Sequence, residues 1–222
     1  VISIVFQNFF KFAVPNFAVY YLTGSLIFNF MNEATSSAMV SIVGNAPLIK
    51  KVYIPKYIFP LEKVMFAFVN MLFSMIALVI MMGVTKLGII GSAADLNISW
   101  TIVLFFIPML YTLVFSLGLG LILAAVNVYF RDVGHLYSVW TMAWMYLTPI
   151  IYPMDIVEGT WVMNVIRLNP MYYFVTYFRD VVTNGTVPGL KTNLLCMGIS
   201  LLFLVLGLWV FKKKQDRFIL FI

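Results

Sequence analysis

The sequence predicts an all-α polytopic membrane protein with six transmembrane helices, the first of them truncated, and short re-entrant or interfacial helices between the fifth and the sixth. Hydrophobic residues make up 63% of the 222 residues and charged residues only 10%, whereas soluble domains carry about 25% charged residues. The mean hydropathy is +1.02. The charges cluster between long uncharged runs, and about 20 apolar residues suffice to cross a bilayer core. We expect residues 1–222 to form a single transmembrane domain.

The first elements are expected to be the outer end of a truncated span and a long second helix. Val1–Phe10 is apolar, and the sequence begins without methionine, so we expect a fragment that lacks most of its first span. Pro15 then breaks the chain and Asn16 is a candidate N-cap. The helix that follows, from about Phe17 to about Gly44, would be roughly 40 Å long at 1.5 Å per residue.

A strongly basic loop, Asn45–Lys63, follows the second helix. Its three prolines prevent one continuous helix, but Leu48–Ile54 leaves room for two helical turns. A short, basic and partly apolar helix on the membrane face is suited to docking another protein. An anchor that only fixes the orientation of the chain would have the same composition.

Four further uncharged runs are long enough to span the bilayer. In the second of these runs, Trp100 marks an interface, and Pro108 and Gly118-Leu-Gly120 allow bending or close helix packing. In the next, Pro149 and Pro153 stop the helix that begins at Val133. The expected runs are Val64–Thr85, Leu96–Phe130 with its helix ending near Val126, Val133–Met154 with its helix ending near Leu147, and Thr192–Phe211.

The distribution of basic residues predicts the orientation of the chain. If the loop at Lys50 is cytoplasmic, alternation of the spans places nine of the 14 basic residues on that side, together with the C-terminus. These nine are Lys50, Lys51, Lys56, Lys63, Arg131, Lys212, Lys213, Lys214 and Arg217. The five on the other side are Lys11, Lys86, Arg167, Arg179 and Lys191.

Several kinds of chemistry are not supported by the sequence. It has no G-x-x-x-x-G-K-[ST] phosphate-binding loop, so we expect no ATP hydrolysis by this chain alone. No set of His, Cys, Asp and Glu residues has the spacing of a metal site, and His135 lacks a placed nucleophile. Cys196 is the only cysteine, so no disulfide forms within the chain. The net charge of +6 reports orientation rather than nucleic-acid binding.

Glu33 is an acidic residue within the second predicted helix, beside the small residues Ala34-Thr-Ser-Ser-Ala38. An ionisable residue at membrane depth is a candidate functional residue. A carboxyl group near the interface that bonds to a neighbouring helix is the alternative interpretation.

The segment Met154–Leu190 is too long and too aromatic to be a simple connection. Asn169 and Pro170 predict the start of a helix. Aromatic residues then recur four apart along one helix face, and two more precede them in the chain. An aromatic-lined exit for sugars and an interfacial aromatic belt without a ligand both fit this pattern. The residues are Tyr173 with Tyr177, Phe174 with Phe178, and Tyr152 and Trp161.

Six short sequences occur in an order and at spacings that resemble the membrane subunits of type-2 ABC exporters, which move teichoic acid, O-antigen and capsular polysaccharide. No one of them is specific alone, but the series covers nearly the whole chain. They are Asn16-Phe-Ala-Val-Tyr-Tyr-Leu-Thr-Gly24, Asn45-Ala-Pro-Leu-Ile-Lys-Lys-Val-Tyr-Ile-Pro55, Val128-Tyr-Phe-Arg-Asp132, Thr148-Pro-Ile-Ile-Tyr-Pro153, Leu168-Asn-Pro170 and Tyr177-Phe-Arg179. We expect the amphipathic N-terminal interface helix of the family to lie before the first residue of this sequence.

The resemblance implies a permease subunit of the bacterial cytoplasmic membrane, working as a homodimer with two copies of a cytoplasmic ABC ATPase. The cargo would be a lipid-linked polysaccharide or teichoic acid. ATP and Mg²⁺ would be bound by the partner ATPase, and this chain would bind no cofactor, metal or nucleic acid, only membrane lipids and cargo.

The resemblance also assigns roles to residues. The ATPase coupling loop would comprise Asn45, Leu48, Lys50, Lys51, Tyr53, Pro55 and Lys56, and the cytoplasmic entrance Arg131, Asp132 and Glu33. The outer aromatic exit would comprise Tyr152, Trp161, Tyr173, Phe174, Tyr177 and Phe178, and helix breaks would fall at Pro149, Pro153 and Pro170.

Two other functions remain open at this stage. The first is an ABC-type exporter whose cargo is a drug or a lipid. The second is a stand-alone channel, a secondary transporter or a membrane scaffold. A secondary transporter would carry ionisable residues near the midplane of several spans, and only Glu33 approaches that pattern.

Overall fold

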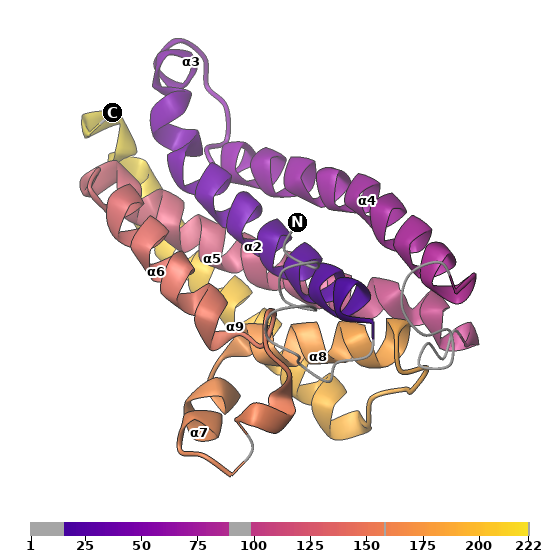
Figure 1. Ribbon diagram of the computed structural model, residues 1–222. Helices are drawn as coiled ribbons and strands as arrows, with labels where there is room; N and C mark the ends of the chain where they lie inside the picture. Colours follow the sequence, from indigo (N-terminus) through magenta and orange to yellow (C-terminus); the bar gives the residue numbers. More distant parts are fainter. Residues whose placement is uncertain (1–15, 89–98, 158, 222) are drawn as a thin grey trace. The chain divides into compact units, whose positions relative to one another are not determined.

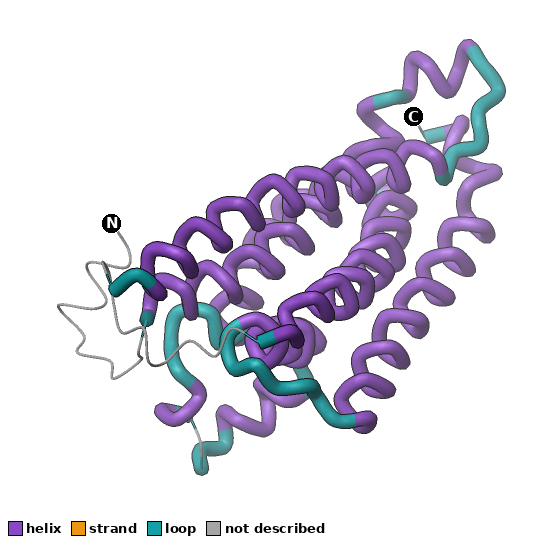
Figure 2. Tube along the Cα trace, turned by 90° about the vertical axis from the view of Figure 1, so that its right-hand side faces the viewer, coloured by secondary structure: helices purple, strands orange, loops and turns teal. Residues whose placement is uncertain are grey.

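The computed structural model describes residues 16–88, 99–157 and 159–221, and this part of the chain is helical without strands (Figure 2). The predicted first span, Val1–Phe10, lies outside the described residues. The α-helices are α2 (Phe17–Gly44), α3 (Ala46–Lys51), α4 (Ile58–Lys86), α5 (Phe106–Tyr129), α6 (Val133–Leu147), α7 (Val162–Arg167), α8 (Pro170–Val182) and α9 (Leu190–Lys214) (Figure 1). The 3₁₀ helices are η2 (Trp100–Phe105), η3 (Met154–Ile156) and η4 (Gln215–Leu220).

Three helical segments within the described residues are long and apolar enough to cross a membrane: Ile58–Lys86, Trp100–Tyr129 and Leu190–Leu220. Helix α2 has 28 residues and is long enough, but polar residues lower its hydropathy. Helix α6 has 15 residues and would be only about 22 Å long. The expected all-α membrane fold is therefore confirmed in its helical character, and the count of six spans stays a prediction.

Several predicted helix ends agree with the structure, and others move for local reasons. The bounds of α2 and α6 are as predicted. Helix α3 begins two residues earlier than predicted because Pro47 lies in its first turn, where a missing N–H costs nothing. It ends at Lys51 and not at the predicted Ile54, because the chain is already extended at Val52. Helix α5 is preceded by η2 because Pro108 is accommodated in its first turn rather than its interior.

The contacts divide the chain into two compact units. The first unit holds residues up to Phe28, Met71–Met109 and Trp144–Asn193, and the second holds Asn29–Asn70, Leu110–Ala143 and Leu194–Ile222. Helices α2, α4, α5, α6 and α9 each contribute residues to both units. The single domain expected from the sequence stays a prediction.

The second unit is built on two close helix pairings. In the first, Thr35 of α2 and Tyr137 of α6 share a buried hydrogen bond of 2.6 Å. In the second, α5 and α9 approach at glycines: a Cβ at Gly118 would clash with the backbone of Phe203, and one at Gly207 would clash with Gly118. Small residues permit such backbone contact between helices in membranes.

The first unit is organised around α8, whose inner face is buried. Phe174, Val175 and Phe178 are fully covered. Helix α8 lies against η2 and α7, and the Thr101 hydroxyl of η2 donates to the Val181 carbonyl of α8 at 3.1 Å. An isolated helix of 13 residues is marginally stable, so this burial is what fixes α8 in place.

Candidate functional site

The predicted coupling loop folds onto the last residues of the described chain. Ile49 of α3 is buried in one apolar cluster with Phe59, Phe211 and Phe218, and Ile54 packs against it. We call α3, the loop residues to Lys56 and η4 together the α3–tail surface. Both views show α3 and the C-terminal segment at the same end of the second unit (Figures 1 and 2).

Lys56 joins the loop to the tail by a directed contact. Its Nζ donates to the carbonyl of Gln215 at 2.6 Å and lies 6.0 Å from the centre of the Phe218 ring. A charged donor on a carbonyl is stronger than a neutral hydrogen bond. Of the predicted coupling residues, Lys56 thus has an anchoring contact rather than a free side chain.

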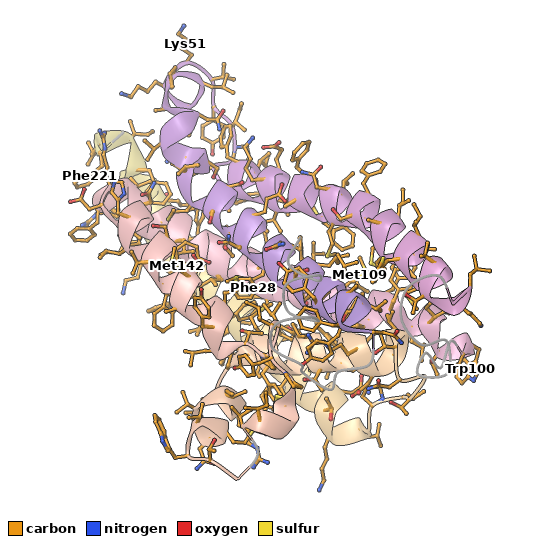
Figure 3. All side chains as sticks on the ribbon, in the orientation of Figure 1. Phe28, Lys51, Trp100, Met109, Met142 and Phe221 are labelled. Carbon is orange, nitrogen blue, oxygen red and sulfur yellow. The ribbon has the colours of Figure 1, made fainter. Side chains whose placement is uncertain are left out.

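The other coupling residues present an exposed basic and apolar face. Lys50 and Lys51 are exposed, and the Lys51 side chain extends outward from α3 (Figure 3). Tyr53 is 99% exposed, and Leu48 is exposed at 44%. Asn45 instead fastens the loop to the end of α2, since its amide donates to the Ser41 carbonyl at 2.8 Å. Exposed aliphatic and aromatic side chains beside one another are typical of a protein-docking face.

The turn between α5 and α6, which carries Arg131 and Asp132, lies beside the same tail. Both side chains are exposed. The Tyr129 hydroxyl donates to the Lys214 carbonyl at 3.2 Å, and the Tyr129 ring packs edge-on against Phe221 at 4.7 Å. The loop at Lys50, the turn at Arg131 and the lysines that end α9 therefore gather in one part of the second unit, and that this part is cytoplasmic stays a prediction.

Glu33 is hydrogen-bonded to a second helix. The Asn70 amide of α4 donates to Glu33 Oε1 at 2.8 Å. No contact among the described residues joins Glu33 to Arg131 or Asp132, so their assignment to one entrance stays a prediction.

Arg179 is the centre of the first unit, whereas from the sequence it is only one of the outer-side charges and part of Tyr177-Phe-Arg179. Its Nη1 donates to the Pro149 carbonyl at 2.6 Å, its Nη2 to the Tyr20 carbonyl at 3.0 Å, and its Nε lies 3.4 Å from the Thr23 hydroxyl. The guanidinium also lies 3.6 Å from the centre of the Tyr20 ring, a cation–π distance. Burial lowers the pKa of Arg179 to about 10, so the side chain keeps its charge at neutral pH.

Arg179 needs Gly24 beside it. A Cβ at Gly24 would lie 2.5 Å from Arg179 Nη2 and 3.4 Å from the Ile150 Cα. At the break after α6, the Pro149 carbonyl has no partner within the helix and instead accepts from the charged Arg179 side chain. The Tyr20 hydroxyl adds a bond to the Tyr152 carbonyl at 2.9 Å. A helix break in an apolar environment requires such partners.

Asn169 satisfies the other side of the same break. Its Oδ1 accepts from the Trp144 indole at 2.6 Å and from the Met171 N–H at 2.9 Å. Its Nδ2 donates to Thr148 Oγ1 at 2.9 Å and to the Leu147 carbonyl at 3.2 Å. Asn169 is therefore the predicted N-cap of α8 and also the residue that joins α8 to the end of α6.

The six predicted exit residues do not share one surface. Phe174, Tyr177 and Phe178 are buried within the first unit, and the Tyr177 hydroxyl donates to Asn193 Oδ1 at 2.8 Å. Trp161 is 77% exposed, while Tyr152 and Tyr173 are half-buried. The residues of this set that can meet a ligand from outside are Trp161, Tyr173 and Tyr152. The role of the set as an exit stays a prediction.

The comparison with known proteins gives the family. A family model described as ABC-2 type transporter matches residues 1–183. The chain belongs to the ABC-2 type transporter family. It is similar to the O-antigen export system permease protein RfbA of Klebsiella pneumoniae, with 27% identity over 216 residues, which is 96% of this chain and 79% of the relative. It is also similar to the protein of that name from Myxococcus xanthus, with 25% identity over 206 residues, 92% of this chain and 76% of the relative.

In this ABC-2 permease, residues from four of the six family-like sequences meet in the first unit. Tyr20 and Gly24, Pro149, Asn169 and Arg179 come from separate sequences and lie around one helix break. Spacing along the chain could not reveal this, because the sequences are up to 159 residues apart. The one feature of the sequence that pointed to this site was Arg179, an arginine within a strongly aromatic predicted helix.

Asn169→Ala should destabilise the first unit. It removes the cap, which costs about 1 kcal/mol, and the hydrogen bond that Asn169 Oδ1 accepts from the buried Trp144 N–H, which contributes about 0.5–1.5 kcal/mol. At about 2–4 °C per kcal/mol, the unfolding temperature in detergent should fall by several degrees. Asn164→Ala, on the exposed part of α7, is the matched control and should change it little. Equal unfolding temperatures for the two variants would contradict the role given to Asn169.

Proposed function

We propose that this chain is the permease subunit of an ATP-driven exporter that moves a lipid-linked polysaccharide or teichoic acid out across the bacterial cytoplasmic membrane. The observation that carries the proposal is the similarity to relatives named as O-antigen export permeases, which extends over 92–96% of the chain. O-antigen is a lipid-linked polysaccharide, so a related cargo is the simplest assignment. An exporter of a drug or lipid would share the family but not this similarity.

The α3–tail surface is the proposed contact with the ATPase. It is basic and partly apolar, and it is anchored to the second unit by Ile49, Phe218 and Lys56. A push on an anchored segment is transmitted to the helices that hold it, whereas a free loop would absorb it. Two ATPase copies would bind a homodimer of this chain, and they would supply the ATP and Mg²⁺ sites.

The same surface supports the proposed orientation. The loop at Lys50, the α5–α6 turn and the end of α9 are joined by contacts, as expected if α2, α4, α5, α6 and α9 cross in alternation. We place this side, with the C-terminus, in the cytoplasm by the excess of basic residues. With a first span before α2 this gives six spans, and α7 and α8 become the short re-entrant or interfacial helices on the outer side.

The entrance and exit follow from this orientation. Arg131 and Asp132 are exposed at the cytoplasmic turn, where an anionic lipid head could first contact the protein. Trp161 and Tyr173 would meet sugar rings at the outer side, while Phe174, Tyr177 and Phe178 support α8 from within. Pro149, Pro153 and Pro170 end or begin the helices that build this region.

Co-purification tests the assembly. The protein should be extracted from its own host membranes in a gentle detergent, captured, and its partners identified by mass spectrometry. We expect a protein with a phosphate-binding loop, in a 1:1 ratio with this chain. Capture of this chain alone, also after crosslinking, would contradict the exporter and favour a stand-alone channel or scaffold. Loss of surface polymer on deletion of this chain would then identify the cargo.

Lys50→Glu with Lys51→Glu should uncouple the ATPase. Reversing two exposed charges on α3 replaces attraction by repulsion at the face that would bind the ATPase, so we expect cargo-stimulated ATP turnover to fall at least tenfold, equivalent to about 1.4 kcal/mol, while the protein remains folded. The measurement is cargo-stimulated ATP turnover of the purified complex. Lys86→Glu with Lys191→Glu is the matched control, because both lysines are exposed and lie on the proposed outer side. Unchanged stimulated turnover in the α3 variant would contradict the coupling role.

A further inference from the structure

Helix α2 has two faces of different chemistry within the second unit. Met31, Ala34, Thr35, Ala38 and Ile42 form the buried face. The opposite face is polar: Asn29 and Glu33 are exposed, and three further residues are partly exposed. We call this set the α2 polar face: Asn29, Asn32, Glu33, Ser36 and Ser37. Their spacing places them along one side of the helix over about two turns.

The α2 polar face lies far from both ends of its helix. At 1.5 Å per residue, Glu33 is about 24 Å from Phe17 and about 16 Å from Gly44 along the axis. Its partner Asn70 is about 18 Å from the start of α4. In a helix that crosses a hydrocarbon core of about 30 Å, these residues are at membrane depth.

The neighbouring surface of α4 is apolar, as expected of a helix side that faces lipid. Around Asn70, the exposed residues Met65, Phe66 and Val69 are apolar, with Phe66 60% exposed. On α2, the two residues that are exposed between Asn29 and Ser37 are the asparagine and the glutamate of the α2 polar face. The two helices therefore present different chemistry to whatever surrounds them.

Lipid cannot be the environment of the α2 polar face. An acidic residue at the centre of a membrane helix costs about 2.5–3.5 kcal/mol on insertion scales, and unpaired amides in hydrocarbon cost several kcal/mol. Polar residues at such depth face protein or a water-filled cavity. Among the described residues, the hydrogen bond from Asn70 leaves Glu33 Oε2 free to accept.

We propose that the α2 polar face, together with Asn70, lines a water-filled path and forms hydrogen bonds with the hydroxyl groups of an uncharged stretch of glycan. The inference rests on the proposed function and narrows its cargo. Carboxylate and amide oxygens accept from sugar hydroxyls, and the amides also donate to them. Helix α2 contains no lysine or arginine, so this face offers no cation to a chain of phosphates, and an ionised Glu33 would repel one.

Thiol labelling in membranes tests whether the face is wet. In a Cys196→Ala background that still exports, Asn29→Cys and Ser36→Cys should react with a charged, water-soluble maleimide, because the reactive thiolate requires water. Phe66→Cys and Val69→Cys on α4 are the matched controls. We expect labelling at least tenfold faster at the two α2 positions.

The alternative environments give different results in the same variants. If the face packs against a second copy of the chain, Asn29→Cys should give disulfide-linked dimers on oxidation and resist the maleimide. If it faces lipid, neither labelling nor dimers should appear. Either result would overturn the proposal. Labelling does not require a particular cargo. Failure of the proposed water-filled path and failure of the proposed polysaccharide cargo can therefore be told apart.

Substitution of Glu33 tests the contact with cargo. Glu33→Leu, which removes the acceptor, should lower the rate at which polymer reaches the cell surface at least fivefold, whereas Glu33→Gln should retain most of it. Glu62→Leu is the matched control, since Glu62 is an exposed acid paired with Lys63 near the start of α4. Full export by Glu33→Leu would overturn the contact. Exported polymer with a phosphodiester in every repeat would overturn the assignment to uncharged glycan.

Discussion

Arg179→Ala should lower the unfolding temperature by about 10 °C or more and remove most folded protein from the membrane. Deleting a large buried side chain costs about 3–5 kcal/mol through lost packing. The same substitution removes the charged bonds to the Pro149 and Tyr20 carbonyls and the contact with the Tyr20 ring. The measurement is thermal unfolding in detergent, together with the amount of monodisperse protein recovered.

Two further variants separate the charge of Arg179 from its shape. Arg167→Ala removes an exposed arginine of α7 and should leave the unfolding temperature nearly unchanged. Arg179→Lys keeps the charge but loses the planar fork that reaches two carbonyls, so it should lie between the wild type and Arg179→Ala. A wild-type unfolding temperature for Arg179→Ala would show that these contacts do not hold the first unit together.

Gly118→Ala should force α5 and α9 apart. The added methyl group would overlap the backbone of Phe203 and Leu204, which is part of a helix and cannot rotate away as a side chain can. Overpacking costs about 1–3 kcal/mol, and occasionally more. The shift should also strain the bond from Ser200 Oγ to the Tyr111 carbonyl, 2.9 Å long. Thermal unfolding and the yield of folded protein measure the effect.

Gly198→Ala is the matched control for this substitution. Gly198 also lies in α9, but a Cβ there meets nothing within 4 Å. Alanine is a better helix former than glycine by about 1 kcal/mol, so Gly198→Ala should be neutral or slightly stabilising. If the two alanine variants behave alike, the close approach of α5 and α9 is not required for stability.

Much of the helical framework could be predicted from the sequence because it follows from local rules. The ends of α2 and α6 were predicted from proline breaks and charged residues, and the structure confirms them. The cap at Asn169 with Pro170 behind it is also confirmed, since Asn169 accepts from the Met171 N–H. Each depends on residues within one or two turns of the helix end.

The ends of α4 and α9 were predicted less well, because charged residues served as the predicted limits of these helices. Helix α4 begins at Ile58, earlier than the uncharged run that starts at Val64, because Glu62 and Lys63 are tolerated on its exposed side. Helix α9 extends beyond its predicted run at both ends for the same reason. Charged residues mark the ends of the hydrophobic runs in the sequence, but the helices continue past them.

In the candidate functional sites too, features that depend on local sequence were predicted and features that depend on long-range contacts were not. The exposed lysines of the coupling loop were found from composition, and the structure exposes Lys50 and Lys51. The anchoring of Lys56 to Gln215 could not be foreseen, because it joins residues 159 apart. Arg179 was counted among outer-side charges, and nothing near it in sequence indicates that Pro149 and Tyr20 need its hydrogen bonds. Phe174, Tyr177 and Phe178 are buried while Trp161 is exposed, a difference that depends on tertiary packing and that spacing along the chain does not show.

The hydrogen bonds around the helix break at Pro149 limit how the permease can move. A kink with unpaired carbonyls flexes easily, since bending it breaks no bond. Here bending would have to break the bonds from Arg179 and Asn169 together. The end of α6, α8 and the start of α2 should therefore keep their mutual geometry through the transport cycle. Any gating motion should then involve residues outside these three segments. Distances measured between probes on the end of α6, α8 and the start of α2 should be the same with and without nucleotide.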